Sequence, residues 1–501
     1  MTLSAKSPSF LLSLALAAAS GGMLLFSMPG YDLWYLAWIA LVPLLLAVRR
    51  HQGLQRYILF NITGLIWSIG CHAWFPDVLG KGLGMFLMVA SGLLYGFFLQ
   101  LGCDLQQRFK HYKLSILIVP VVWTALEWLR FVLPVTRDWW IEVLAKTQWT
   151  VPENLQILSV TGFPGLSFLI VLTNTAIAAI LIKLWKERRP DRTALALLLI
   201  PVAVLSWGKL TVDTSYTSDT FTVAAHADLA NQDPEIVKLG GGTTAGDGYL
   251  ADTEAMSQAI FDVNEALTLD AAKEAKPAFV VWGENEFTSY GNEAMIGKLK
   301  ELAATAHTHI VADVVWNSDA GMHDTALLIG PDGAEIGKTA KINITGGEEE
   351  YGFVPGQAWG SVFDTAYGMV GLGVCWDRHT TGIVRALSRN GARLVLMPVD
   401  DDFNANPLFP HYAASDTVFR AVENRAAIVT GSTAGMSQVI TPFGEVTAAS
   451  GINTREWISG ETFTVQEQSV YTRYGDWFGN LAAACFVLIV GLSAARKKKP
   501  K

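Results

Sequence analysis

The sequence predicts a chain of two fold classes: a bundle of membrane-spanning helices and a separate α/β domain. Only 16% of the 501 residues are charged, whereas soluble globular proteins have about 25%. The deficit lies mainly in residues 1–208, where nearly continuous apolar runs are separated by short polar bridges. Residues 209–477 have ordinary globular composition and alternate short apolar runs with helical stretches. Residues 478–501 form a last apolar stretch with a basic tail.

The apolar runs are long enough to cross a bilayer, which takes about 20 mostly apolar residues. We expect eight spans, at residues 9–28, 33–48, 57–76, 83–103, 114–134, 162–184, 192–208 and 478–495. The turn at Pro29-Gly30 leaves two possibilities for the first pair, a helix pair or a partly re-entrant unit. The first run is too long for a typical signal peptide and continues directly into the second, which argues against cleavage.

Basic residues between the spans indicate the orientation of the chain. They lie in alternate loops and in the tail: Arg49, Arg50, Arg56, Arg108, Lys110, Lys113, Lys183, Lys186, Arg188, Arg189, Arg192 and residues 496–501. An N-terminus in the cytoplasm puts all of these on the cytoplasmic side, as the positive-inside rule requires. We therefore expect a multi-pass protein of a bacterial inner membrane, with both termini cytoplasmic and residues 209–477 in the periplasm.

Residues 209–477 contain continuous β-branched runs without alternation, which are typical of strands buried on both faces. The predicted strands are 221–225, 279–282, 309–313, 325–329, 369–374, 394–398 and 427–430. Helices are expected at about 251–270 and 292–306. Strands alternating with helices predict a layered α/β domain.

One cysteine stands apart from the other three. Cys71, Cys103 and Cys485 fall in predicted spans, where a small apolar thiol is ordinary packing. Cys375 is the only cysteine of residues 209–477. Exported domains use cysteine mostly as disulfide pairs, so this thiol is either a buried bystander or a retained nucleophile.

Three reactive residue types follow predicted strands or their connections. Glu284 follows Val280-Val281-Trp282-Gly283, Lys341 follows residues 331–340, and Cys375 follows residues 371–374. Sites of α/β folds lie past strand ends. A carboxylate can take the thiol proton, the thiolate can attack a carbonyl, and an ammonium can stabilise the oxyanion. Each residue alone is usually solvated surface, but their joint placement indicates acyl transfer.

The order strand–Glu284, Gly337-Lys338-x-x-Lys341 and Gly371-x-x-x-Cys375 resembles the nitrilase (carbon–nitrogen hydrolase) superfamily. That superfamily has a Glu–Lys–Cys triad in an α-β-β-α sandwich. Residues 31–45, 120–130 and 161–169 are similar to its membrane-bound branch, the apolipoprotein N-acyltransferase family. The resemblance covers essentially the whole chain. It implies eight spans, with the nitrilase-like domain between the seventh and the eighth.

The resemblance also implies a reaction. A phospholipid would donate an acyl chain to Cys375 as a thioester, and the α-amine of a diacylglyceryl-cysteine apolipoprotein would accept it during lipoprotein maturation. Glu284, Lys341 and Cys375 match the triad. Glu349 matches a further glutamate of the family, although Glu348 and Glu350 leave its register open. The supporting or substrate-binding positions would be Glu349, Trp376 and Asp377.

Four segments depart from the family pattern around the expected site. The usual Trp-Pro-Glu is Trp282-Gly283-Glu284, and the usual Val-Pro-Phe-Gly-Glu is Ile-Thr-Gly-Gly-Glu at 344–348. The usual Cys-Tyr-Glu is Cys-Trp-Asp at 375–377, and Asn-Asp-Ala-Trp-Phe is replaced by Val-Asp-Asp-Asp-Phe at 399–403. The triad is intact, so acyl transfer is still expected, while an acceptor amine other than a lipoprotein is an alternative.

Two other function classes fit the sequence less well. A membrane-tethered amidase or nitrilase would use the same triad with water as acceptor, but seven preceding spans are more than a tether needs. A non-enzymatic receptor or transporter would carry charges inside its spans, and only Glu127, with Arg130 nearby, is conspicuous.

No cofactor, metal or nucleic acid is expected. The nine histidines are scattered without ligand spacing, and no basic patch with interleaved aromatic residues accompanies the net charge of −8. We expect a monomer, because the helix bundle already covers one side of the α/β domain.

Overall fold

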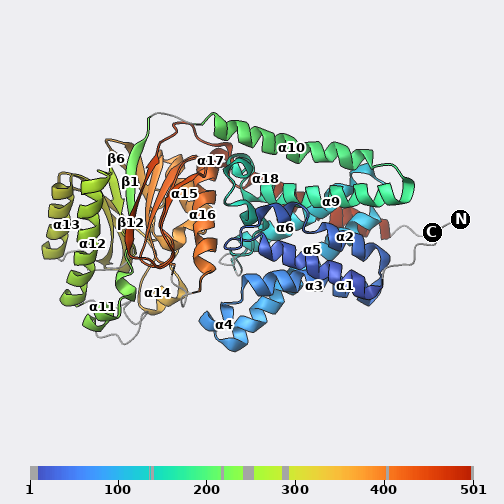
Figure 1. Cartoon of the computed structure of the whole chain (residues 1–501), viewed down its shortest axis with the longest axis horizontal. Coiled ribbons are helices and arrows are strands. Elements are labelled where there is room, and N and C mark those ends of the chain that lie inside the picture. Colours follow the sequence, from blue (N-terminus) through green and yellow to red (C-terminus); the bar gives the residue numbers. More distant parts are fainter. Residues whose placement is uncertain are drawn as a thin grey trace. The chain divides into compact units, whose positions relative to one another are not determined.

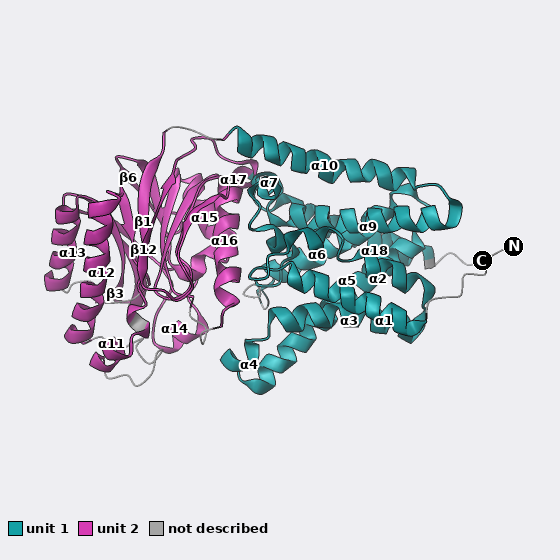
Figure 2. Ribbon diagram, viewed as in Figure 1, with its two compact units in different colours: residues 1–214, 474–501 teal, residues 215–473 magenta. Residues whose placement is uncertain are grey.

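The computed structural model describes residues 9–134, 136, 140–215, 219–240, 253–284, 293–401 and 406–497. The chain forms two compact units (Figure 2). Unit 1 comprises residues 1–214 and 474–501, and unit 2 comprises residues 215–473.

Unit 1 is helical. Its longer helices are α1 (Phe10–Phe26), α3 (Gly53–Cys71), α5 (Lys81–Arg108), α6 (Ile118–Val132), α9 (Phe163–Glu187), α10 (Arg192–Asp213) and α18 (Trp477–Lys497). The short ones are η1 (Trp34–Trp38), α2 (Val42–Ala47), η2 (Val48–Arg50), α4 (Phe75–Val78), η3 (Lys113–Leu117), η4 (Leu144–Gln148), α7 (Pro152–Leu155) and α8 (Leu158–Thr161).

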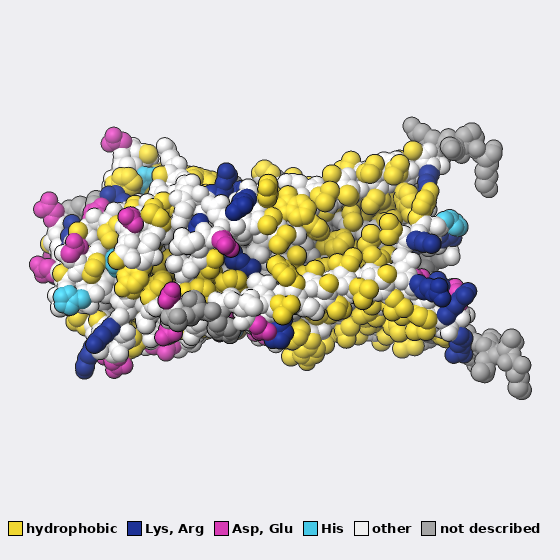
Figure 3. Space-filling view, turned by 90° about the horizontal axis from the view of Figure 1, so that it is seen from above, with side chains coloured by type: hydrophobic (Ala, Val, Ile, Leu, Met, Phe, Trp, Pro, Cys, Tyr) yellow, Lys and Arg dark blue, Asp and Glu magenta, His cyan; other side chains and the backbone are white. Residues whose placement is uncertain are grey.

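Among the described residues, five helical segments are long and apolar enough to cross a membrane: Lys81–Arg108, Lys113–Val132, Phe163–Glu187, Arg192–Asp213 and Trp477–Arg496. Phe10–Phe26 is a shorter apolar helix. Figure 3 shows a broad apolar surface over the helices of this unit, with Lys and Arg side chains gathered at one end of it. The predicted multi-helix membrane part of the fold is confirmed.

Residues 33–48 do not form one helix, so of the two possibilities for the first pair the simple helix pair was wrong. The segment is broken into η1, α2 and η2. Asn174 of α9 compensates for the break, because its Oδ1 accepts the N–H of Leu41 (2.8 Å) and its Nδ2 donates to the carbonyl of Ala37 (2.8 Å). Non-helical backbone is tolerated at membrane depth where protein groups satisfy it.

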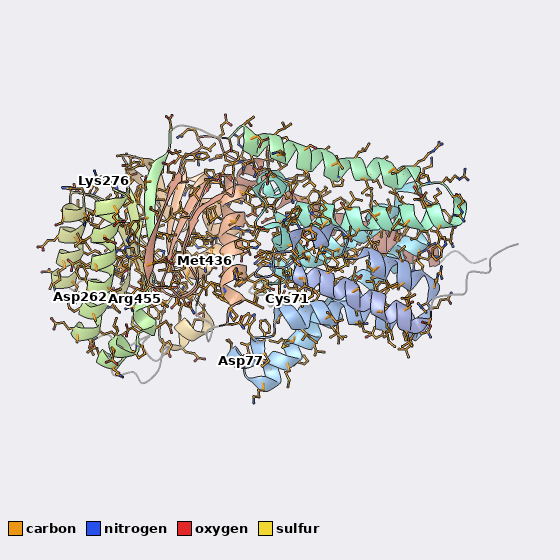
Figure 4. All side chains as sticks on the ribbon, viewed as in Figure 1. Cys71, Asp77, Asp262, Lys276, Met436 and Arg455 are labelled. Carbon is orange, nitrogen blue, oxygen red and sulfur yellow. The ribbon has the colours of Figure 1, made fainter. Side chains whose placement is uncertain are left out.

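Small residues let α3 and α5 approach closely. A Cβ on Gly64 would collide with the carbonyl oxygen of Gly92, and one on Gly96 would lie 2.9 Å from Oδ1 of Asn61. Membrane helices associate through such small-residue contacts because lipid provides no hydrophobic drive between them. Cys71 ends α3 (Figure 4).

The charges of α6 hold the irregular segment that follows it. The Glu127 carboxylate accepts the N–H of Leu144 (2.9 Å), and the Arg130 guanidinium donates to the carbonyl of Glu142 (2.7 Å). Glu127 is fully buried. These two residues therefore fix local backbone, which removes the main sequence argument for a transporter.

Unit 2 is an α/β domain. Its strands are β1 (Phe221–Ala227), β2 (Phe279–Val281), β3 (His309–Ser318), β4 (Gly321–Ile329), β5 (Glu335–Ala340), β6 (Val362–Thr365), β7 (Gly368–Leu372), β8 (Leu394–Val399), β9 (Ala427–Ser432), β10 (Gln438–Ile440), β11 (Val446–Ala449) and β12 (Glu456–Thr462). Its helices are η5 (Ala230–Gln232), α11 (Pro234–Leu239), α12 (Glu254–Glu274), α13 (Glu293–Ala306), α14 (Gly346–Glu350), η7 (Cys375–Arg378), α15 (Gly382–Arg389), α16 (Phe409–Asn424) and α17 (Val470–Tyr474).

The strands form two layers connected at one edge. Their order is β5-β4-β3-β2-β1-β9-β8-β7-β6, and the single pair Ala227–Ser432 joins β1 to β9. Beyond the hydrogen-bonded path, β2 and β3 lie against β8, which brings the two halves together. Figure 1 shows α12 and α13 on one side of the strands and α15 and α16 on the other. The predicted α-β-β-α sandwich is confirmed.

The central strands of each layer run parallel, so their carboxyl ends lie at the same edge of that layer. β2 is parallel to β1 and β3, and β8 is parallel to β7 and β9. Side chains fill the space between helices and strands (Figure 4). Phe261 of α12, Leu299 of α13 and Val280 of β2 belong to one buried apolar cluster. This packing fixes the strand ends on which the site is built.

Candidate active site

The three predicted triad residues follow three strands and are all buried. Glu284 follows β2, Lys341 follows β5 directly, and Cys375 opens η7 after β7. Lys341 Nζ lies 2.6 Å from Glu284 Oε1. Their relative exposures are 2% for Glu284, 2% for Lys341 and 6% for Cys375. The Cys375 thiolate charge would interact with both Lys341 and Glu284.

Lys341 lies among three buried carboxylates. Besides Glu284, its Nζ pairs with Glu348 and lies 3.0 Å from Asp324 Oδ2. The three carboxylates are close enough to one another, within 4.8 Å, to hold a metal ion. The Lys341 ammonium already lies among them, where it donates to Glu284 and Glu348 and forms an ion pair with Asp324. The geometry therefore favours a protein cation over a metal ion here.

The structure puts Glu348, and not Glu349, next to the lysine. Thr345 caps α14: its hydroxyl accepts the N–H of Glu348, and its own N–H donates to Glu348 Oε2 at 2.5 Å. This capping box turns Glu348 inward, with 3% of its side chain exposed. Glu349 is exposed, so the glutamate that supports the lysine is one residue earlier than expected, and a substrate-binding role for Glu349 stays a prediction.

Cys375 has a backbone conformation that L-residues rarely adopt. Its φ is +40°, at the turn where β7 leads into η7. Such strain is found at active sites, where the surrounding structure enforces it. Its Sγ lies 3.5 Å from the carbonyl oxygen of Asp400. The sharp turn presents the thiol at the strand end, in the manner of a nucleophile elbow.

Asp377 connects the nucleophile loop to the lysine loop. Its carboxylate accepts N–H groups of Asn343 (2.8 Å), Ile342 (3.2 Å) and Val374 (3.3 Å). Trp376 is only partly buried, and its ring meets His379 edge-on at 4.8 Å. Asp377 is thus a supporting residue of the Cys375 loop, and Trp376 is the more accessible of the two.

The electrostatics of the triad favour neutral Cys375 and charged Lys341. Burial raises the pKa of the Cys375 thiol well above its usual value, and a Glu284 charge adds to this, against Lys341 and Arg378. Burial would lower the pKa of Lys341, but the neighbouring acidic groups outweigh it and raise that pKa. Burial raises the pKa of Glu284 despite Lys341. The thiol therefore needs a base at the moment of attack.

A second buried ion pair lies beside Cys375 and holds the end of η7. Arg378 pairs with Asp401, and both side chains are 1% exposed. Asp401 belongs to the altered segment 399–403, of which residues 402 and 403 lie outside the described residues. Truncating one partner of such a pair leaves a buried charge uncompensated, which is costly.

Comparison with known proteins agrees with this geometry. Residues 20–176 match the model of the apolipoprotein N-acyltransferase N-terminal domain, and residues 249–467 match that of carbon-nitrogen hydrolases. An apolipoprotein N-acyltransferase from Geobacter metallireducens is 27% identical over 96% of this chain and 95% of its own length. One from Nostoc sp. is 24% identical over 92% of this chain and 94% of its own. The chain belongs to the apolipoprotein N-acyltransferase family.

Membership of this family confirms an N-acyltransferase enzyme of the nitrilase superfamily and a membrane protein. Human omega-amidase NIT2 is 29% identical, but that match covers only 31% of this chain and 61% of the amidase. The two acyltransferase matches, in contrast, extend through both units.

One departure from the pattern of the apolipoprotein N-acyltransferase family has a steric reason in this chain. A Cβ on Gly283 would lie 2.5 Å from the backbone nitrogen of Thr433 and 2.8 Å from Oδ2 of Asp228. The Thr433 hydroxyl donates to the carbonyl of Glu284 at 2.9 Å. Glycine therefore allows Thr433, the residue after β9, to support the backbone of Glu284 directly.

Sequence reasoning missed two residues of this candidate site. Glu348 is the last residue of Thr345-Gly-Gly-Glu348, a capping-box pattern that would have chosen it over Glu349. Asp324 carries a signal too, because it is a charged residue directly before the apolar run Thr325–Ile329 of a strand. A carboxylate inside a buried strand needs a partner, and that partner is Lys341.

Proposed function

We propose that this chain moves a fatty acyl chain from a phospholipid, through a thioester on Cys375, to the N-terminal amine of a diacylglyceryl-cysteine lipoprotein. Glu284 acts as the general base and Lys341 as the oxyanion partner. Glu348 and Asp377 hold these groups in place.

In the first half-reaction, Glu284 takes the thiol proton while Sγ of Cys375 attacks the ester carbonyl of the phospholipid. The Lys341 ammonium stabilises the negative charge on the carbonyl oxygen. The C–O bond then breaks, Glu284 returns the proton to the leaving oxygen, and a lysophospholipid departs.

In the second half-reaction, the lipoprotein amine attacks the thioester carbonyl. Glu284 takes a proton from the amine, the C–S bond breaks, and the proton returns to the sulfur. An amide is the product, and the free thiol is restored. The same base thus serves both halves.

One observation carries this proposal: a nitrilase-type Glu–Lys–Cys cluster and the family's own N-terminal domain occur in one chain. Hydrolysis of a soluble amide needs no such membrane part. A lipid acyl donor does, because its ester group stays at the membrane surface.

The proposal includes a topology in a bacterial inner membrane, with both termini cytoplasmic and unit 2 periplasmic. Contacts within unit 1 support it by joining its basic segments. Arg56 pairs with Asp104 (2.8 Å), Arg108 donates to Ser493 (2.7 Å), and Arg50 lies over the Trp185 ring (4.4 Å). Positive charge at one end marks the cytoplasmic face.

Alkaline phosphatase fused after residue 230 tests this topology. The fusion would be active in this topology and inactive in the reverse one.

The first test is intact mass spectrometry of the detergent-solubilised protein after incubation with phosphatidylethanolamine. Wild-type protein should gain one acyl group, and Cys375→Ala should gain none. Cys485→Ala is the matched control, since Cys485 is a thiol of unit 1, and should acylate like the wild type. A monomer is expected at the mass-photometry peak of the same sample.

Adding a diacylglyceryl lipopeptide then separates the proposal from its nearest alternative. Discharge of the adduct with formation of a triacylated peptide supports the acyltransferase. If water discharges the adduct at the same rate with and without the lipopeptide, a membrane-tethered carbon–nitrogen hydrolase is favoured. A folded wild type that forms no adduct contradicts the proposed donor.

A further inference from the structure

The charges around Lys341 do not balance if every acid is ionised. Glu284, Asp324 and Glu348 surround one ammonium, with side-chain exposures of 1%, 0% and 3%. Like charges this close cannot all ionise in a buried site, so protons are retained. Which acid keeps a proton decides whether Glu284 is ready to act as a base.

Asp324 contacts Lys341 through its backbone as well as its side chain, although the side-chain hydrogen bonds of the Lys341 ammonium go to Glu284 and Glu348. Asp324 Oδ2 lies 3.0 Å from Lys341 Nζ, and its backbone carbonyl accepts the N–H of Lys341 at 2.8 Å. It lies on β4, where the antiparallel register with β3 puts Val315 opposite it and the buried Asp313 at a diagonal position on the same face. Lysine and aspartate are thus held together by backbone and side chain alike.

The neighbouring acids respond to this arrangement in opposite directions. Burial would raise the pKa of Asp324, but the nearby Lys341 ammonium, with smaller contributions from Asp313 and Glu284, holds it below its ordinary value. Burial raises the pKa of Glu284, and charges on Asp324 and Glu348 add to the rise against Lys341. The charged and titratable groups around Glu284 are Lys341, Asp324, Glu348 and Cys375. Asp313 lies beside Asp324, and Arg378 and Asp401 act on the thiol.

We propose that Asp324 is a positioning residue that serves as the standing counter-ion of Lys341 and thereby keeps a proton on Glu284 in the free enzyme. The inference rests on the proposed role of Glu284 as base. Glu284 then becomes active only after it loses this proton to solvent. The rate of Cys375 acylation should therefore rise with pH, and Asp324 sets the pH at which it rises. This low-pH side of the pH–rate profile is the acid limb.

Asp324→Asn tests this role because it removes the charge and preserves the shape. Without Asp324, Lys341 pairs with Glu284 and Glu348 alone, which favours the ionised form of Glu284. The acid limb of the acylation rate should move to lower pH by about one unit or more, as removal of a like charge does. Asp332→Asn is the matched control, because Asp332 is exposed on the same hairpin, and its limb should coincide with that of the wild type.

The probe is p-nitrophenyl butyrate with the full-length protein in detergent, monitored as the first-turnover burst of p-nitrophenolate between pH 4 and 9. This leaving group needs no proton, so the burst reports the base alone. Phospholipid acylation of the wild type, measured in parallel, tests the proposed function itself. If wild-type protein acylates with neither donor, the proposed function fails.

If the wild type acylates and folded Asp324→Asn keeps the wild-type limb or moves it to higher pH, the role of Asp324 is wrong. A lower rate with an unmoved limb is the outcome of a merely structural role. Asp324→Ser removes the same charge with a smaller side chain and must shift the limb in the same direction, which keeps the test decisive should the asparagine variant not fold.

Discussion

Asp377 accepts a 2.8 Å hydrogen bond from the backbone N–H of Asn343, and this contact joins the loop of the nucleophile to the loop of the lysine. Lys341 and Cys375 come from opposite halves of the strand path. Their relative position therefore depends on connections made after the strands end. Asp377 makes such connections through the N–H groups of Asn343 and Ile342, and its bond to the N–H of Val374 holds it within its own loop.

Asp377→Ala should slow thioester formation by about 100-fold, because small displacements of reacting groups have effects of that size. It should also lower the free energy of unfolding by at least about 2 kcal/mol, since buried N–H groups lose their acceptor. Acylation rate and thermal unfolding in detergent measure the two effects. Asp377→Asn retains one acceptor oxygen and should lose less than about tenfold. Equal losses in both variants would contradict the tether.

Glu348 and Glu349 form a natural pair for a test of the corrected register. Glu348→Gln removes a buried charge from Lys341, so acylation of Cys375 should fall by about 100-fold or more. Glu349→Gln changes an exposed residue of the same helix and should stay within about twofold of the wild type. A larger loss from the Glu349 variant than from the Glu348 variant would refute the placement of Glu348.

Gly283→Ala should push the Glu284 backbone away from Thr433. The added Cβ overlaps the backbone nitrogen of Thr433, and such overpacking costs about 1–3 kcal/mol. Both the unfolding temperature and the acylation rate should fall. Gly297→Ala is the matched control, since its Cβ meets nothing within 4 Å on α13 and should be neutral or stabilising. A Gly283 variant with wild-type acylation would show that this glycine is dispensable.

Asp401 should make stability depend on pH. Burial raises its pKa from 3.8 to about 6, against the effect of Arg378. The folded state therefore binds the proton more tightly than the unfolded state, and the resulting stabilisation is present below pH 4 and lost as pH rises from about 4 to 6. Two units correspond to roughly 3 kcal/mol.

The measurement is the unfolding temperature of wild type and Asp401→Asn between pH 4 and 8. Asparagine cannot titrate, so the variant should lose less stability than the wild type across pH 4–6. Parallel curves for the two proteins would mean that Asp401 has an ordinary pKa in the folded state.

The placement of Glu284, Lys341 and Cys375 near strand ends could be predicted because each of them follows a strand or hairpin with a local sequence signal. The strand before Glu284 lies in a short run of apolar residues, Phe279–Trp282, and the two glycines shortly before Cys375, Gly371 and Gly373, indicate a turn. Long-range partners left weaker traces. The pairing of Asp324 with Lys341 depends on the β4–β5 hairpin register, which a single sequence does not specify.

The two corrections have a common physical cause. At residues 33–48, an apolar run alone predicts a helix, but Asn174, more than 100 residues later, supplies the hydrogen bonds that let the helix break. At residues 348–350, composition does not distinguish three consecutive glutamates, and the capping box of Thr345 turns only Glu348 toward Lys341. In both places tertiary or capping contacts decide what composition leaves open.

The positive φ of Cys375 has a consequence for variation in this family. Only glycine adopts such a conformation without cost, so Cys375→Gly would relieve strain while ending catalysis. Selection for folding alone would thus drive this position away from cysteine, and a library screened only for thermostability should accumulate inactive enzymes there. The nucleophile persists only while acyl transfer itself is under selection.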